Sequence, residues 1–134
     1  MELLHGIDIV ELTKFRAVLS RHPSFAGEVF TSGERVYCEA RSDVLLHFAG
    51  RFAAKEATLK ALGLGLRIGI DRTLQDIEVI RAASGRPRLR LTGWPARLCA
   101  ARGLSQIVLS ISHTAGYAMA SVILWSNSSS APSG

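Results

Sequence analysis

The chain is organised around Arg51-Phe52-Ala53-Ala54-Lys55-Glu56-Ala57-Thr58-Leu59-Lys60, which sets one acid and three cations into an alanine-rich, apolar helix. At helical spacing Glu56 and Lys60 share a face, and Phe52 lies one turn before Glu56. The acid therefore borders the apolar side of the helix. The stretch by itself also allows an ordinary ion pair between Glu56 and Lys60 on a solvated face, and this reading stays open.

Signals on both sides of this stretch set the limits of its helix. Ser42 is a good N-cap and Gly63 suits the position just beyond the last turn, which leaves roughly twenty helical residues. Farther out, residue patterns predict strands over 3–10, 76–80, 88–91, 107–112 and 117–125, and helices over 11–21, 31–41 and 94–102. The last two strands are expected to join through His113-Thr114-Ala115-Gly116. Helices mixed with hairpin-linked strands indicate an α+β domain.

The size and charge of the chain limit its class. With 134 residues, 48% of them hydrophobic, it is long enough for one core and too short for two. We expect a single domain over residues 1–125 and a disordered tail over 126–134, which is rich in Ser, Pro and Gly. The net charge of +5 favours an acidic partner or an anionic ligand. Since no dense basic tract is interleaved with aromatics, nucleic acid is not an expected partner.

Cysteine usage and the termini indicate a cytoplasmic protein. Cys38 and Cys99 are isolated, so neither a disulfide framework nor a zinc site is indicated. The N-terminus carries acids where a secretory signal would need an apolar core. The apolar stretch over 107–125 is interrupted by polar residues such as Ser110 and His113, which argues against a membrane span.

Two carboxylates occupy positions that are costly unless a cation neutralises them. Asp8 closes an apolar strand, and Glu56 borders the apolar side of its helix. Magnesium suits such a pair, because it takes oxygen ligands and usually completes its shell with phosphate and water. The pattern therefore suggests a phosphorylated substrate. The sequence also allows that the two residues never meet in space.

Several residues are candidates for holding that phosphate. They are Lys60, Arg86 in a Gly-Arg-Pro turn, His113 with Thr114, and backbone amides near Gly63 and Gly65. Each also has a plain structural reading, as a solvated turn residue or a helix end.

Taken together, the motifs resemble one family. They are Gly6-Ile7-Asp8-Ile9-Val10-Glu11, Phe30-Thr31 with Glu34 and Tyr37, the 51–57 stretch with Lys60, Asp76-Ile77-Glu78, Gly85-Arg86-Pro87, and Ser110-Ile111-Ser112-His113-Thr114. In this order and near this spacing, over about residues 1–122, the chain is similar to the holo-acyl-carrier-protein synthases, which are bacterial 4'-phosphopantetheinyl transferases.

The resemblance implies transfer of the phosphopantetheine arm of coenzyme A to a serine of apo acyl carrier protein in fatty acid biosynthesis. It implies magnesium held by Asp8 and Glu56, with Asp8, Glu56 and Lys60 in catalytic roles. By the same likeness, the residues around the coenzyme are Arg51, Lys55, Lys60, Gly63, Gly85, Arg86, Pro87, His113 and Thr114. The family fold is a mainly antiparallel sheet packed against a long central helix, in a homotrimer with active sites at subunit boundaries.

The first helix matches the family's docking site for the carrier protein. Lys14, Val18 and Arg21 lie at i, i+4 and i+7, and they form a basic face with an apolar centre that suits a small acidic partner. One departure is Ser84, which stands where relatives often carry Asn before the Gly-Arg-Pro turn. The alternative of another class is a non-catalytic basic module that binds acidic proteins or RNA, with Asp8 and Glu56 paired internally.

Overall fold

The structure is a computed structural model that describes residues 2–64 and 73–127. Met1, residues 65–72 and residues 128–134 lie outside the described part. The expectations placed on Gly65 and on most of the tail fall on these residues.

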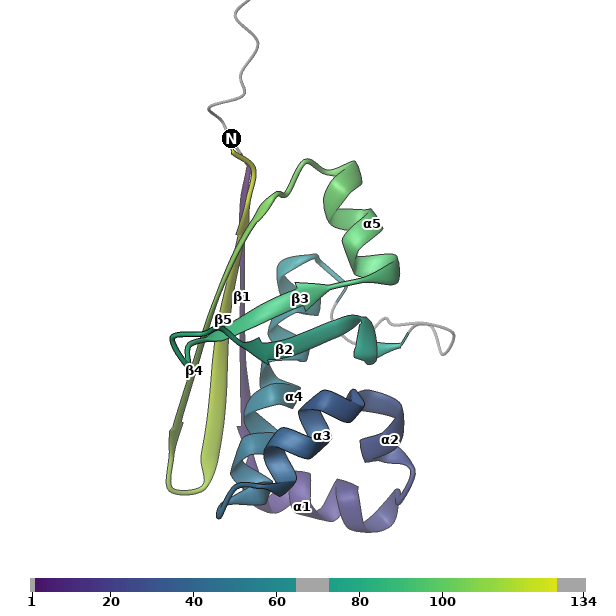
Figure 1. Cartoon of the computed structure of the whole chain (residues 1–134), viewed down its shortest axis with the longest axis vertical. Coiled ribbons are helices and arrows are strands. Elements are labelled where there is room, and N and C mark those ends of the chain that lie inside the picture. Colours follow the sequence, from purple (N-terminus) through teal and green to yellow (C-terminus); the bar gives the residue numbers. More distant parts are fainter. Residues whose placement is uncertain (1, 65–72, 128–134) are drawn as a thin grey trace, which may run out of the picture.

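A three-stranded antiparallel sheet forms one side of the molecule (Figure 1). Its order is β1 (Leu3–Glu11), β5 (Tyr117–Trp125) and β4 (Gln106–Thr114). Burial alternates along β5, where Ala118, Ala120, Val122 and Leu124 are buried and the residues between them are not. This period of two marks a sheet with one face on the core.

All described helices lie on the same face of this sheet (Figure 1). Helix α4 (Val44–Ala61) has 18 residues and packs along β1 and β5. Helices α1 (Leu12–Arg21), α2 (Phe25–Val29) and α3 (Ser32–Glu39) gather at one end of α4. The 3-10 turn η1 (Leu74–Asp76), the hairpin β2 (Ile77–Arg81) and β3 (Pro87–Leu91), and α5 (Gly93–Ala101) cover the rest. The predicted α+β organisation with antiparallel sheets is confirmed.

Helix α4 begins one residue later than the sequence suggested. The side chain of Asp43, and not that of Ser42, caps the helix by accepting a hydrogen bond from the Leu46 amide at 3.2 Å. Its other end follows the expectation, because Gly63 has φ +78 and its amide donates to the Lys60 carbonyl at 3.0 Å.

Gly6 lets β1 approach α4 closely. A Cβ atom on Gly6 would stand 1.9 Å from the carbonyl oxygen of Ala57 and 2.7 Å from the amide nitrogen of Ala61. Both are backbone atoms that cannot move aside. The close approach brings Asp8, two residues further on the same face of β1, to the side of α4 that carries Glu56 and Lys60.

We expect Gly6→Ala to lower the free energy of unfolding by about 1–3 kcal/mol, because β1 and α4 must separate. Thermal denaturation followed by circular dichroism measures the change. Gly27→Ala is the control, since a Cβ there meets only the Arg35 side chain, at 3.7 Å. Equal melting temperatures for the two variants would contradict the packing described.

One local expectation needs correction, and one helix was not expected. His113 and Thr114 are the last residues of β4, so the connection to β5 is only Ala115-Gly116, and Gly116 has the positive φ that such a tight hairpin needs. Helix α2 had no prediction, because five residues are too few to show a helical period. Its Phe25 contacts Phe15, Phe30 and Phe52 in an aromatic cluster. Tertiary packing therefore stabilises this short helix, which no local sequence signal predicts.

Candidate functional site

Asp8 and Glu56 meet at an open pocket beside β1. The pocket has a volume of about 280 Å³ and is lined by Asp8, Ile9, Val10, Glu11, Lys14, Phe15, Val18, Phe52 and Glu56. Its lining combines apolar side chains with four charged ones. Strand β1 supplies the first acid and helix α4 the second, so the two predicted metal ligands lie on one surface.

Lys60 pairs with Asp8 and not with Glu56. The distance from Lys60 Nζ to Asp8 Oδ1 is 2.7 Å, across 52 positions of the chain. Glu56 forms no ion pair with any residue that the structure describes. Partial burial raises its pKa, the negative charge of Asp8 raises it further, and Lys60 opposes both effects. The simple i,i+4 ion pair between Glu56 and Lys60 is therefore wrong.

These two acids suit a hard divalent cation. Within residues 2–64 and 73–127, no group of three or more His, Cys, Asp and Glu side chains could hold a metal. A metal at this pocket would thus depend on Asp8 and Glu56 together with oxygens from a ligand and water, which is the arrangement magnesium favours. Among the described residues, Lys60 is the one cation that acts on the pKa of the half-buried Glu56 carboxylate, and a metal ion would add a second positive charge.

A second group of residues, here called the basic group, lies on the β4 side of α4 and contains Arg41, Arg51, Arg81, His47 and His113. A cavity of about 160 Å³ is lined by Tyr37, Leu46, His47, Gly50, Arg51, Arg81, Pro87, Ile111, His113 and Ala118. The structure thus brings three predicted residues together: Arg51 from α4, Pro87 from β3 and His113 from β4.

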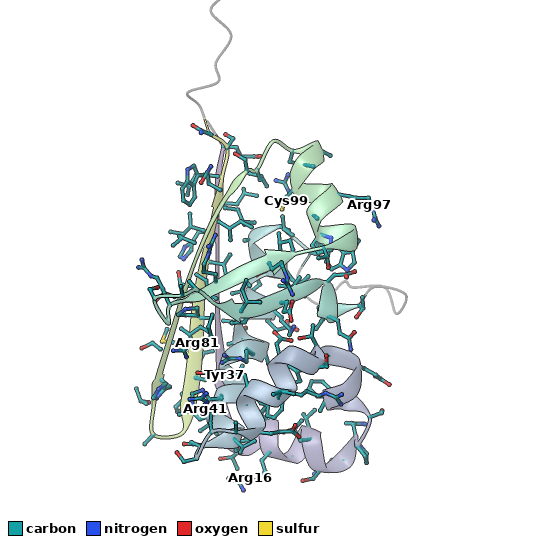
Figure 2. All side chains as sticks on the ribbon, in the orientation of Figure 1. Arg16, Tyr37, Arg41, Arg81, Arg97 and Cys99 are labelled. Atoms are coloured by element: carbon teal, nitrogen blue, oxygen red, sulfur yellow. The ribbon has the colours of Figure 1, made fainter. Side chains whose placement is uncertain are left out.

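Three guanidinium groups surround Tyr37 in this basic group, and Figure 2 labels two of the arginines, Arg41 and Arg81, beside it. The Cζ atoms of Arg41, Arg51 and Arg81 lie 4.3, 4.2 and 5.1 Å from the centre of the Tyr37 ring. Arg51 is only 5% exposed, and its Nε has no hydrogen-bond partner in the described part of the chain. Among the described residues, no carboxylate pairs with any of the three arginines. Such a concentration of positive charge suits an anion.

Sequence reasoning missed most of this cluster. Tyr37 appeared only as part of a motif, and Arg41, Arg81 and His47 had no assigned role. Tyr37 is on α3 and Arg41 is the second residue after that helix, whereas Arg81 is on β2 and His47 is on α4, so no short spacing in the sequence links the whole group. The pKa of His47 is lowered by burial and then by the charges of Arg51 and Arg41, which reflects the same positive field.

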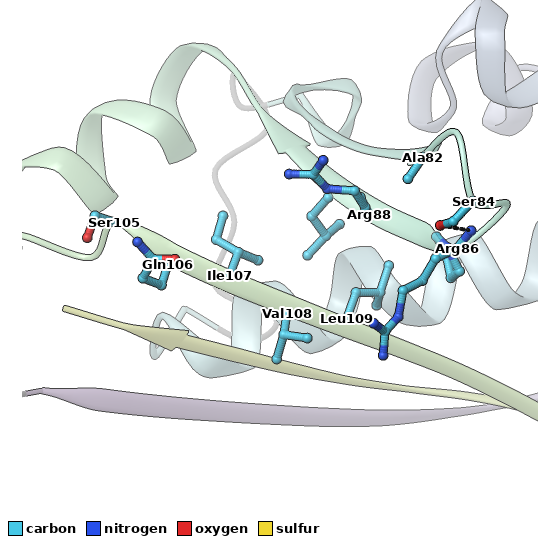
Figure 3. A pocket seen from close by; sticks show the side chains of 11 residues that line it. Ala82, Ser84, Arg86, Arg88, Ser105, Gln106, Ile107, Val108 and Leu109 are labelled. Carbon is cyan, nitrogen blue, oxygen red and sulfur yellow. Dashed lines mark hydrogen bonds between the residues drawn. The ribbon is translucent and has the colours of Figure 1, made fainter. Parts of the chain in front are cut away.

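The Gly85-Arg86-Pro87 turn borders a groove between β3 and β4 (Figure 3). Gly85 has φ +87, and the turn is closed by the Ala82 amide donating to the Arg86 carbonyl at 2.9 Å. Ser84 Oγ accepts from the Arg86 amide at 3.4 Å. Arg86 and Arg88 line the groove, whose volume is about 460 Å³, together with Gln106 and Val108 of β4. Thr114 is exposed at the far end of β4.

Lys55 does not fit the ligand-binding role expected of it. Its side chain is 0% exposed, and its ammonium group lies 2.8 Å from Glu34 Oε1. It also donates to the carbonyls of Leu74 at 3.0 Å and Ile77 at 2.5 Å, so all three N–H donors are used inside the protein. The residue ties α4 to α3 and to the start of β2. Its position between Arg51 and Glu56 gave no sign of this, because the partners come from distant segments.

The expected docking residues lie on α1 beside the carboxylate pocket. Lys14 and Val18 line that pocket, and Lys14 Nζ lies 3.9 Å from Glu11 Oε2. Arg21 is the last residue of α1 and is exposed. Below them Phe15 stacks on Phe52 with ring centres 5.4 Å apart, which fixes α1 against α4.

The candidate residues thus form two groups at opposite edges of the main sheet. The acidic group is at the β1 edge, the basic group is at the β4 edge, and β5 runs between the two strands. The two pockets share no lining residue.

Comparison with protein families and curated proteins gives a consistent result. Residues 5–122 match the family model described as the 4'-phosphopantetheinyl transferase superfamily. A holo-[acyl-carrier-protein] synthase of Geobacter metallireducens is 44% identical over 120 residues, which cover 89% of this chain and 94% of that protein. The enzyme of the same name from Syntrophotalea carbinolica is 46% identical over 123 residues, with 91% and 94% covered.

Solved structures agree with the sequence relatives. The ACPS–CoA complex of Chronobacterium ammoniagenes superposes with a TM-score of 0.81 at 33% identity, over 95% of this chain and 99% of that one. The Helicobacter pylori holo-[acyl-carrier-protein] synthase in complex with coenzyme A gives a TM-score of 0.76 at 29% identity, over 91% and 100%. The chain therefore belongs to the 4'-phosphopantetheinyl transferase superfamily, within its holo-[acyl-carrier-protein] synthase family.

Proposed function

We propose that this protein transfers the 4'-phosphopantetheine arm of coenzyme A to a serine of apo acyl carrier protein, in fatty acid biosynthesis. The products are the holo carrier protein and adenosine 3',5'-bisphosphate. The observation that carries the proposal is the meeting of Asp8, Glu56 and Lys60 at one edge of the fold, in a chain whose family members carry this activity in their name. Free, buried Cys38 and Cys99 suit the reducing cytoplasm, where we place the reaction.

The chemistry assigns a separate task to each residue. The serine oxygen forms a bond to the β-phosphorus of coenzyme A, and the bond from that phosphorus to the bridging oxygen breaks. Glu56 is the base that accepts the serine proton, and partial burial with the charge of Asp8 raises its pKa, which makes the carboxylate a stronger base. Lys60 neutralises the charge that develops on the departing phosphate. Magnesium held by Asp8 and Glu56 would supply further charge stabilisation on the diphosphate.

The direct test is mass spectrometry of an apo acyl carrier protein incubated with this protein, coenzyme A and magnesium. Transfer adds about 340 Da, the mass of one phosphopantetheine arm carried by the cofactor. Omission of magnesium should abolish the gain. If several apo carrier proteins gain no mass while the protein stays folded, the proposal is wrong.

We assign the coenzyme's phosphates to the basic residues. Arg51 and His113 line the cavity beside the arginine cluster, and the Gly85-Arg86-Pro87 turn borders the adjoining groove. Support comes from the absence of carboxylate partners for Arg41, Arg51 and Arg81 within the described residues. Gly63 and Thr114 remain proposed contacts on the strength of the family resemblance.

Docking of the carrier protein is assigned to α1. We expect the double variant Lys14→Glu/Arg21→Glu to raise the KM for the carrier at least tenfold, because two attractive charges become repulsive to an acidic partner. Steady-state kinetics with each substrate varied in turn measure the effect. The KM for coenzyme A serves as the internal control, and an equal rise in both constants would contradict the assignment.

We further propose a homotrimer with active sites shared between subunits. The outer face of the main sheet exposes Leu3, Ile7, Ile9, Val108 and Tyr117, and no described element covers it (Figure 1). Further copies of the chain are the partners proposed for this apolar face. Association would also let the basic group of one subunit meet the acidic group of its neighbour, two groups that lie at opposite edges within one chain.

Light scattering after size-exclusion chromatography is expected to give three times the chain mass of 14.5 kDa. Ile7→Lys should reduce it to the mass of one chain, because the interface would then bury unpaired charges. Val36→Lys is the control, since Val36 is also an exposed apolar residue, at 70% against 46% for Ile7, and it lies on α3, away from the sheet. A trimer that survives Ile7→Lys would exclude this face as the interface.

A further inference from the structure

The ion pair between Lys60 and Asp8 has a consequence for the order of ligand binding. The ammonium group stands 2.7 Å from an oxygen that the proposed function gives to a divalent cation. A cation bound to Asp8 would therefore meet a positive charge already in contact with its ligand. Two like charges at such a distance repel each other unless one of them moves.

Lys60 is free to move, and Asp8 is not. The Lys60 side chain is 49% exposed, and its only described polar contact is with Asp8. The Asp8 side chain is 14% exposed, on the strand that Gly6 holds against α4. The long flexible stem of a lysine can carry its ammonium group from a carboxylate to a nearby phosphate without repacking the core.

We propose that Lys60 acts as a lock on Asp8: in the free protein it opposes divalent-cation binding, and it releases Asp8 when a ligand's diphosphate offers it a new partner. Cation and diphosphate then bind cooperatively, and each raises the affinity for the other by the same factor. This inference rests on the proposed function, because it takes the diphosphate of coenzyme A as the releasing group.

The lock differs in its effect from an ordinary surface ion pair. An ordinary pair would add a little stability and leave cation affinity untouched. Here Glu56 stays without an ion pair among the described residues. Lys60 lies on the same face of α4 as Glu56, but its ammonium group contacts Asp8 on β1 instead. Of the two acids, Glu56 is thus available to a cation, whereas Asp8 is paired with Lys60.

The test measures Mn²⁺ binding to the purified full chain by electron paramagnetic resonance, first without and then with saturating coenzyme A. Values with coenzyme are corrected for manganese bound to free coenzyme. For manganese alone, we expect Lys60→Met to bind about three- to tenfold more tightly than the unaltered protein. Added coenzyme A should tighten binding strongly in the unaltered protein and much less in Lys60→Met.

Two further variants control the result. Lys14→Met removes the same charge from a lysine beside the same pocket, whose ammonium lies 3.9 Å from Glu11, and should change manganese affinity less than about twofold. The double variant Asp8→Asn/Lys60→Met should lose the gain of Lys60→Met, because the released ligand is gone.

The lock is wrong if Lys60→Met binds manganese alone no more tightly than the unaltered protein, or if Lys14→Met gives the same gain. In either case the unaltered protein would still modify the carrier, and the proposed function would stand. If the unaltered protein neither modifies a carrier nor binds manganese in the presence of coenzyme A, the proposed function fails and the lock fails with it.

Discussion

Glu56→Gln is expected to slow phosphopantetheine transfer by about two to four orders of magnitude while the protein stays folded. The amide keeps the size of the side chain but can neither accept the serine proton nor give a charged oxygen to a metal. Single-turnover kinetics at saturating coenzyme A and carrier protein measure the rate. The loss should appear in the rate of the chemical step, since the substitution leaves the basic group and α1 unchanged.

The same variant should be at least as stable as the unaltered protein at neutral pH. Partial burial and the charge of Asp8 raise the folded-state pKa of Glu56, so the folded protein holds this proton more tightly than the unfolded chain. Stability is therefore lost as the pH rises through the unfolded and then the folded pKa. Glutamine at position 56 does not titrate, so the variant does not lose this stability as the pH rises. The difference in melting temperature should vanish below the ordinary pKa of a glutamate.

Glu11→Gln is the matched control, because Glu11 lines the same pocket and carries the same charge. We expect its transfer rate to stay within about threefold of the unaltered enzyme, since surface substitutions away from the reacting groups have small effects. If Glu56→Gln retained more than a tenth of the activity, Glu56 would be neither the base nor a required metal ligand.

Lys55→Met is expected to destabilise the protein by about 3–5 kcal/mol. The change leaves the buried carboxylate of Glu34 without its counter-ion and removes the donor to the carbonyls of Leu74 and Ile77. Burial lowers the pKa of Lys55, and the charge of Glu34 opposes this effect. Each charge of the buried pair is therefore stabilised by the other, and removing one leaves the other buried without a counter-ion. A fall of roughly 10 to 20 °C in melting temperature should follow.

Two comparisons make this prediction specific. Lys60→Met is the same substitution at a half-exposed ion pair on the same helix, and it should cost less than about 1 kcal/mol. Adding Glu34→Gln to Lys55→Met should recover part of the loss, because the buried negative charge is gone. Equal melting temperatures for Lys55→Met and Lys60→Met would show that the buried ion pair contributes no more to stability than the half-exposed one.

The sequence predicted the elements well where local signals were strong. The capping box at Thr31 is present, with the Glu34 amide donating to Thr31 Oγ1 at 3.1 Å. Strands β2 and β3, helices α1 and α5, and the end of α4 at Gly63 all lie within a residue or two of the expected bounds. Signals of this kind act over a few residues, so the chain alone contains them.

Residues whose partners are distant could not be assigned correctly. Lys55 and Glu56 are neighbours in the chain, yet Lys55 is buried in an ion pair with Glu34, whereas Glu56 faces an open pocket. Helical spacing separates their faces but does not say which face is buried. The arginine cluster around Tyr37 escaped notice for the same reason, since Arg51 and Arg81 reach Tyr37 from α4 and β2, two elements other than the helix that carries it.

By itself the sequence determined the type and limits of most elements and, through the order of its motifs, the family. These follow from residue periodicity, caps and motif order, all of which are properties of short segments. Only the tertiary structure decided that Lys60 contacts Asp8, that Lys55 is structural, and that acidic and basic groups stand at opposite edges of the sheet. The reason is that close packing of β1 on α4 at Gly6 fixes which side chains meet, and such packing joins residues far apart in the chain.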